Sequence, residues 1–293
     1  MIESRCGLHC AGCSFKESHG CKGCVETNGV PFYGECDIAV CCQDKGLSHC
    51  GECGVIPCKA LYEYSYLDPE HGDNPPGARV RTCRDWAAES GKQRWENVLL
   101  TSGGWWKTFD INDGFNENIR ARFLKMLGKA PAEARVLFIP TAAIDDEAQV
   151  AAKACMEELL AEGIPGGNIR VYDIDGSLTP DEAMRFDVIY FTGGNTRHLL
   201  KRVIETRFDE IVKRMVYTGK VYIGASAGSL IAMPNLTGAP DDPVMGLCLI
   251  DAYLSVHCAP DAKPRGDLPL SHIPLRDNQA LAVSWQGYEL IED

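Results

Sequence analysis

From residue 97 onward, short apolar runs alternate with longer stretches in which apolar residues recur at helical spacing. The runs are too short for helices and are typical of buried strands. We expect strands at 97–102, 134–140, 168–174, 186–194 and 220–224. We expect helices at 115–127, 146–162, 196–204 and 207–217. Strands separated by helices of this length predict βαβ units and a parallel sheet.

The last part of the chain has shorter signals. Strands are expected at 252–256, 280–285 and 288–291, and Gln286-Gly287 would join the last two as a small antiparallel hairpin. With so little chain left after residue 226, a flavodoxin-like sheet fits better than the longer α/β-hydrolase fold.

The segment between Asp68 and Trp95 is polar and rich in turn formers, with the pair Pro75-Pro76 followed by Gly77. Two adjacent prolines cannot lie inside a helix. The pattern of regular strands and helices begins only after this segment. We therefore predict two domains, a first one with its linker at 1–90 and an α/β domain at 91–293.

Composition and charge exclude several classes of function. The chain has 293 residues, a net charge of −12 and a pI near 5.1, which argues against nucleic acid and anionic membrane surfaces as partners. It has no run of about 18 apolar residues and does not start with a secretory signal pattern. We expect a cytoplasmic protein, in which thiols stay reduced and clustered cysteines bind metal rather than form disulfides.

The stretch GASAG at 224–228 has the context of a nucleophile elbow. It places Ser226 where a strand meets a helix, and glycines at both ends let the two elements approach closely. The amide of Ala227, at the helix start, can point toward a developing oxyanion. A tight turn that uses small residues only for packing would give the same letters, so the motif needs support from elsewhere.

A second glycine pair provides that support. Gly193 and Gly194 follow one buried strand and precede a helix that Asn195 or Thr196 can cap. Parallel strands end at the same edge of a sheet, where ligands bind. We therefore expect the amides of this pair near Ser226, as a second oxyanion donor.

A serine nucleophile also needs a base and an acid. His257 follows the expected strand at 252–256 and would reach the same edge, whereas His272 lies in a less regular stretch and is expected to be either structural or exposed. The acid is expected at Asp241, or at the adjacent Asp242. This pair in a proline-flanked loop could equally form a solvated turn.

The segments VYIGASAGSL, FTGGNTRHLL and LSVHCAPDA, with NVLLTSGG, RVLFIPTAA and IPLRDNQALAV, resemble the peptidase E and cyanophycinase group of serine peptidases over residues 97–293. The resemblance implies a fold related to class I glutamine amidotransferases, with serine in place of their cysteine. It also implies hydrolysis of short peptides. By position, Ser226 would be the nucleophile, His257 the base, Asp241 the acid, and Gly194 and Ala227 the oxyanion hole.

Cysteines dominate the first domain. Twelve of the 15 cysteines lie within residues 6–83. The candidate metal ligands are Cys6, Cys10, Cys13, Cys21, Cys24, Cys36, Cys41, Cys42, Cys50, Cys53 and Cys58. A CxxC turn lets two thiolates reach one tetrahedral ion, and bound metal could stabilise a segment with little apolar core. We expect structural zinc, with an iron–sulfur cluster as the rival because it uses the same ligands.

The cysteine pattern at residues 4–62 resembles a presumed zinc-binding domain of unknown function. Two classes of function remain for the whole chain. The first is a serine peptidase with an accessory metal module, acting on short peptides. The alternative is a non-catalytic protein that binds a partner or senses metal or redox state. Glutamine amidotransfer is disfavoured because the elbow residue is serine. A homo-oligomer and a protein partner of the cysteine-rich domain stay open.

Overall fold

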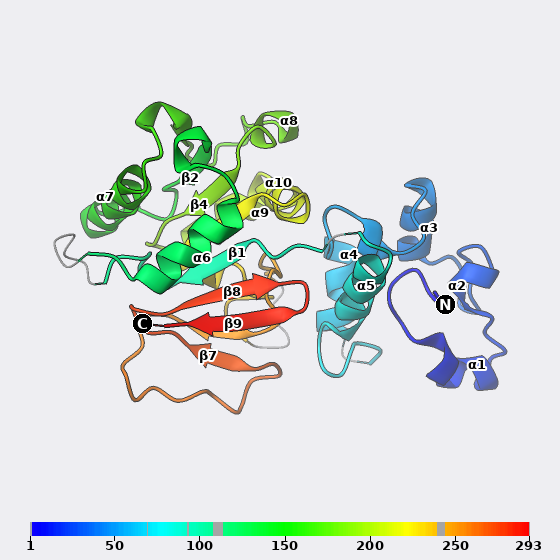
Figure 1. Ribbon diagram of the computed structural model, residues 1–293. Helices are drawn as coiled ribbons and strands as arrows, with labels where there is room; N and C mark the ends of the chain where they lie inside the picture. The colour runs from blue at the N-terminus through cyan, green and yellow to red at the C-terminus, as the bar shows by residue number, and fades with distance from the viewer. Residues whose placement is uncertain (1, 69, 93, 108–113, 239–243, 293) are drawn as a thin grey trace. The chain divides into compact units, whose positions relative to one another are not determined.

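The computed structural model describes residues 2–68, 70–92, 94–107, 114–238 and 244–292. The chain divides into two compact units, Met1–Arg94 and Trp95–Asp293 (Figure 1). Where the chain is described, no helix is both long enough and apolar enough to span a bilayer.

The second unit is built on a sheet of seven strands, counted over the described residues. In spatial order these are β3 (Ile169–Val171), β2 (Val136–Ile139), β4 (Val188–Phe191), β5 (Val221–Ala225), β1 (Val98–Thr101), β8 (Ala280–Ser284) and β9 (Gly287–Ile291). The first five are parallel to one another, and β8 and β9 form an antiparallel hairpin at one edge. The predicted fold class, a mostly parallel sheet between helices, is confirmed.

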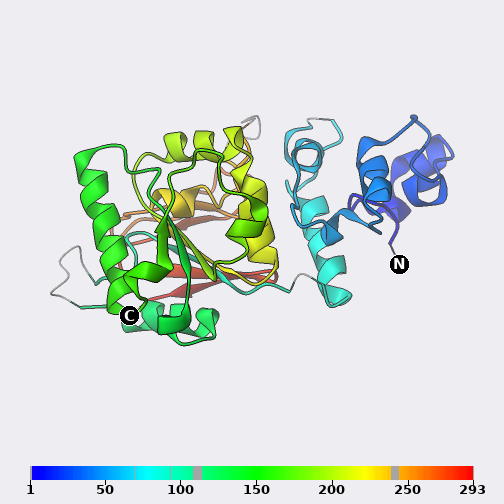
Figure 2. The same ribbon diagram turned by 90° about the horizontal axis from the view of Figure 1, so that it is seen from above.

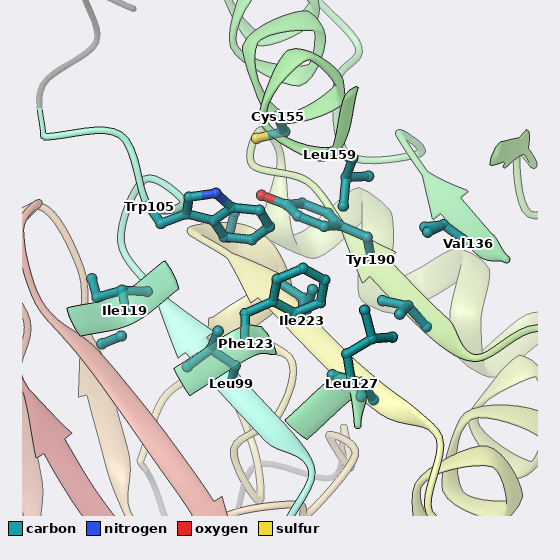
Figure 3. Packing of buried hydrophobic residues seen from close by; sticks show 14 of the residues in the cluster. Leu99, Trp105, Ile119, Phe123, Leu127, Val136, Cys155, Leu159, Tyr190 and Ile223 are labelled. Carbon is teal, nitrogen blue, oxygen red and sulfur yellow. The ribbon is translucent and has the colours of Figure 1, made fainter. Parts of the chain in front are cut away.

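One face of the sheet packs on α6 (Glu117–Leu127) and α7 (Asp146–Ala161). Alternate strand residues such as Val188 and Tyr190 join Phe123 and Leu159 from these helices in one hydrophobic cluster (Figure 3). Trp105 stacks on Phe123, with 5.0 Å between ring centroids. This cluster forms one half of the core.

The opposite face packs on α9 (Thr196–Glu205), α10 (Phe208–Tyr217) and the short α11 (Ala227–Leu230), so the sheet has helices on both sides (Figure 2). A four-residue helix, α8 (Pro180–Ala183), precedes β4. Phe191 of β4, which points away from the first cluster, contacts Phe208 and stacks on Tyr222. Successive side chains of a strand point to opposite faces of the sheet. The apolar residues of each buried strand therefore contribute alternately to the hydrophobic core on one face and to the core on the other.

The helices begin where the sequence provides caps. The side chain of Asn116 accepts hydrogen bonds from the amides at the start of α6, and Asp145 and Asn195 do the same for α7 and α9. Such caps satisfy amides that have no partner inside the helix. Gly128 then ends α6 in a left-handed conformation.

A two-stranded parallel pair, β6 (Tyr253–Ser255) and β7 (His272–Pro274), lies outside the main sheet. The sequence pattern predicted β6 but not β7. His272 is buried there and its Nε2 lies 2.9 Å from Ser255 Oγ, as expected of a structural histidine. Because the two strands run in the same direction, the segments that follow them leave from the same end.

The first unit consists of short helices joined by turns. They are η1 (Cys10–Gly12), α1 (Ser14–Ser18), α2 (Gly23–Glu26), α3 (Asp37–Asp44), η2 (Cys50–Glu52), α4 (Lys59–Tyr62), η3 (Glu63–Leu67) and α5 (Ala78–Glu89). Few apolar side chains are fully buried in it, among them Leu61, Val80 and Ala87. All fifteen cysteines of the chain are free thiols. The unit therefore has a small core for its length.

Glu158 of α7 is a buried carboxyl group in the core of the second unit. Its Oε1 accepts hydrogen bonds from the amides of Trp105 (2.8 Å) and Trp106 (3.0 Å), and its Oε2 accepts one from the Tyr190 hydroxyl (3.0 Å). Glu158 thereby fastens the loop after β1 to α7. Burial raises the pKa of Glu158 from 4.5 to about 8, although the three hydrogen bonds oppose this shift.

This raised pKa predicts a specific pH dependence of stability. The folded protein retains a proton on Glu158 that the unfolded chain loses, so the contribution of this group falls as the pH rises from about 4.5 to about 8. In Glu158→Gln the side chain is neutral in both states. We therefore expect the free energy of unfolding of Glu158→Gln, relative to wild type, to increase over this range in urea titrations. Glu147→Gln, at an exposed position of α7, is the control, and parallel curves for Glu158→Gln and wild type would contradict the prediction.

Candidate active site

Ser226 lies at the turn between β5 and α11, in a backbone conformation with φ 49° and ψ −107°. Residues other than glycine rarely adopt positive φ, and strained conformations of this kind cluster at functional sites, where the surroundings hold them in place. The amide of Ser226 donates to the carbonyl of Thr101 at the end of β1 (3.0 Å). The turn is therefore fixed to the neighbouring strand.

Two glycines make this turn sterically feasible. A Cβ on Gly224 would lie 2.5 Å from the carbonyl carbon of Gly228, and a Cβ on Gly228 would lie 2.6 Å from Phe191 Cβ. Any side chain at either position would push α11 away from β4 and β5. The small residues predicted around Ser226 thus have a direct packing reason, and they leave its hydroxyl at the carboxyl edge of the sheet.

His257 follows β6 and reaches the hydroxyl of Ser226. Its Nε2 lies 3.0 Å from Ser226 Oγ, and its Nδ1 lies 2.5 Å from Oδ1 of Asp277. The first distance is that of an ordinary hydrogen bond, and the second is that of a short one. The side chains of His257 and Asp277 are 42% and 47% exposed. The three side chains form a chain of hydrogen bonds that opens to solvent.

Asp277 was missed as a site residue by the sequence analysis. Asp241, the acid expected there, and its alternative Asp242 lie outside the described residues. Asp277 follows β7, which is parallel to β6, so the two segments bring the carboxylate to the imidazole. The available signal was the segment IPLRDN, quoted above only for its family resemblance.

The glycine pair after β4 lies against the turn. A Cβ on Gly193 would be 3.1 Å from Ser226 Cβ, and a Cβ on Gly194 would be 2.1 Å from the carbonyl oxygen of Ala142. Gly194 has φ 127°, which glycine adopts readily. These contacts place the backbone of Gly193 and Gly194 directly beside the turn of Ser226.

Only some of the cysteines that were predicted as metal ligands lie close to one another in the structure. Five of them line one small cavity around α3 and η2. They are Cys41, Cys42, Cys50, Cys53 and Cys58. The sulfurs of Cys42 and Cys50 are 3.4 Å apart. Across the described residues, however, no three His, Cys, Asp or Glu side chains are arranged so that they could hold a metal ion.

Comparison with models of known protein families shows which family this chain belongs to. The model of peptidase family S51 matches residues 98–287, which is more than half of the chain. The chain belongs to peptidase family S51. A second model, of a family of proteins of unknown function (DUF3795), matches residues 2–63. Both resemblances expected from the sequence are confirmed.

Curated relatives of this S51 chain include peptidases. An uncharacterized peptidase, Lmo0363, of Listeria monocytogenes is 33% identical over 101 residues, which are 34% of this chain and 49% of the relative. Peptidase E of Shewanella amazonensis is 35% identical over 89 residues, which are 30% of this chain and 38% of the relative. The chain thus spans about half the length or less of these relatives.

A crystal structure of a candidate peptidase E from Listeria monocytogenes has the same fold. Its TM-score is 0.50 at 21% sequence identity, and the match covers 68% of this chain and 99% of that one. This likeness supports the α/β fold of the second unit.

The geometry of this S51 site predicts that Asp277, not Asp241 or Asp242, controls the reactivity of Ser226. In a known triad, replacing the acid by its amide costs about 10⁴ in rate because the imidazole adopts the wrong tautomer. We expect Asp277→Asn to slow labelling of Ser226 by a fluorophosphonate probe at least about 100-fold. Asp241→Asn, Asp242→Asn and the exposed control Asp261→Asn should label at the wild-type rate. Slow labelling of Asp241→Asn with normal labelling of Asp277→Asn would refute this assignment.

Proposed function

We propose that this S51 chain is a serine peptidase that hydrolyses short peptides, with Ser226 as nucleophile, His257 as general base and Asp277 as the acid that orients it. The observation that supports this most directly is the hydrogen bond of 3.0 Å between His257 Nε2 and Ser226 Oγ, at a strained turn. A serine whose hydroxyl contacts an imidazole can be deprotonated as it attacks.

In the proposed reaction, Ser226 Oγ attacks the peptide carbonyl carbon while His257 Nε2 takes its proton. The carbonyl oxygen becomes an oxyanion and accepts hydrogen bonds from the amides of Gly194 and Ala227. His257 then gives the proton to the leaving amine, which departs and leaves an acyl group on Ser226. Water, deprotonated by His257, hydrolyses this ester and restores the serine. Asp277 holds His257 in the tautomer with its proton on Nδ1.

The alternative is a non-catalytic protein that binds a partner through a peptidase-like unit. It would require neither the strained backbone of Ser226 nor the contact of its hydroxyl with His257. Both features cost conformational freedom and are typical of reactive sites. The geometry therefore favours the enzyme over the binding protein.

The function is tested by Ser226→Ala. We expect this variant to lose hydrolysis of a short-peptide library and labelling by a fluorophosphonate probe, because it lacks the hydroxyl that would form the acyl intermediate. The substitution removes one oxygen at a half-buried position, so the circular dichroism spectrum should not change. Ser284→Ala, at the end of β8, is the matched control and should retain both activities. Peptide hydrolysis at the wild-type rate by Ser226→Ala would refute the proposal.

We also propose that the cysteine-rich unit binds metal, with zinc as the expected ion and an iron–sulfur cluster as the rival. The support is the cavity lined by the five cysteines between Cys41 and Cys58, whose volume of about 20 Å³ accommodates one guest of about the size of a water molecule. Thiolates are the ligands that zinc and iron–sulfur clusters share. Coordination would require these side chains to rotate toward the cavity centre, because they do not converge in their present positions.

Elemental analysis of protein purified without oxygen tests this second proposal. We expect bound zinc, and we expect replacement of Cys42 and Cys50 together by Ser to remove about one ion per chain, because a structural zinc site needs all four ligands. Cys258→Ser in the other unit is the control and should keep the wild-type content. Metal-free protein whose thermal unfolding is unaffected by a chelator would refute the proposal, and iron with acid-labile sulfide would select the rival.

A further inference from the structure

Ser102 is a fully buried residue directly after β1, and its hydroxyl joins two distant segments. Its Oγ accepts a hydrogen bond from the backbone amide of His257 (3.2 Å) and donates one to the carbonyl of Leu275 (3.1 Å). A hydroxyl can donate and accept at once. One side chain from the centre of the sheet thus contacts the segment that carries His257 and the segment that leads to Asp277.

The two segments also contact each other at this point. The amide of Cys258 donates to the carbonyl of Leu275 (2.9 Å), and the amide of Leu275 donates to the carbonyl of Ser255 (2.8 Å). Leu275 is two residues before Asp277, and Cys258 directly follows His257. The hydroxyl of Ser102 and these backbone groups therefore form one hydrogen-bond network, which joins the two segments that carry His257 and Asp277.

The residue before Ser102 fixes the nucleophile. The carbonyl of Thr101 accepts hydrogen bonds from the amide of Ser226 (3.0 Å) and the hydroxyl of Ser229 (2.7 Å). Consecutive residues at the end of β1 thus hold the turn of Ser226 on one side and the loop of His257 on the other. The distance between nucleophile and base depends on both attachments.

We propose that Ser102 is a positioning residue that holds His257 at hydrogen-bonding distance from Ser226; this rests on the proposed function. His257 itself has a positive φ of 55°, a conformation that persists only where neighbouring groups fix it. Without the hydroxyl, this hydrogen bond to the amide of His257 is lost and the loop can relax. A displacement of about 1 Å in a reacting group can cost about 100-fold in rate.

The test measures labelling of the full chain by a fluorophosphonate probe over a range of probe concentrations. For Ser102→Ala we expect the maximal labelling rate constant to fall about 10- to 100-fold. The probe concentration that gives half of the maximal rate should stay within about twofold of the wild-type value, because the probe contacts other groups. A purely structural role would lower the fraction of molecules that label, not the rate constant of the folded ones. The fraction labelled at completion is therefore recorded in the same experiment.

Ser255→Ala is the matched control. Ser255 lies on β6, two residues before His257, and its hydroxyl lies 2.9 Å from Nε2 of the structural His272. We expect its labelling rate constant to equal that of wild type. An unchanged rate constant in Ser102→Ala, or an equal loss in Ser255→Ala, would overturn the positioning role.

The same measurements separate this inference from the proposed function. Wild-type protein that labels but does not hydrolyse peptides would contradict the peptidase assignment, and the comparison of Ser102→Ala with wild type would still decide the role of Ser102. Wild-type protein that does not label would overturn both, because there would be no reactive serine for His257 to activate.

Discussion

The candidate site depends on one steric constraint, the left-handed backbone of Ser226. This conformation requires the strand before the serine and the helix after it to approach within van der Waals contact. Gly224 and Gly228 allow that approach, since a Cβ on either would overlap backbone or side-chain atoms at about 2.5 Å. The hydroxyl of Ser226 is then presented at the edge of the sheet instead of being buried between the layers.

The position of β1 in the sheet links the turn of Ser226 to the other residues of the site. β1 lies between β5, which leads to Ser226, and β8, which follows the segment with Asp277. The polar atoms at the carboxyl end of β1 are thus close to both halves of the site. His257, 31 positions after Ser226, reaches its hydroxyl from a loop whose backbone is hydrogen-bonded to Ser102, directly after β1.

The local sequence pattern was sufficient to predict much of the fold. It also predicted the pair Ser226 and His257, but not the third residue of the hydrogen-bond chain, Asp277. Apolar runs placed β1, β2, β4 and β5, and the small residues around Ser226 and after β4 indicated where those strands meet. His257 could be proposed because it follows a recognisable strand. Asp277 could not, because β7 has only three residues, one of them Pro274, and its pairing with β6 depends on contacts far apart in the sequence.

Solvent exposure affects the strength of the interaction between His257 and Asp277. The side chains of His257 and Asp277 are both more than one-third exposed, and water weakens the attraction between an imidazolium and a carboxylate. In the proposed reaction, a peptide bound over Ser226 would cover this face and exclude water from it. The same two groups would then interact more strongly when substrate is present than when it is absent. An open hydrogen-bond chain of this kind is well suited to a site whose electrostatic stabilisation develops only as the substrate closes it.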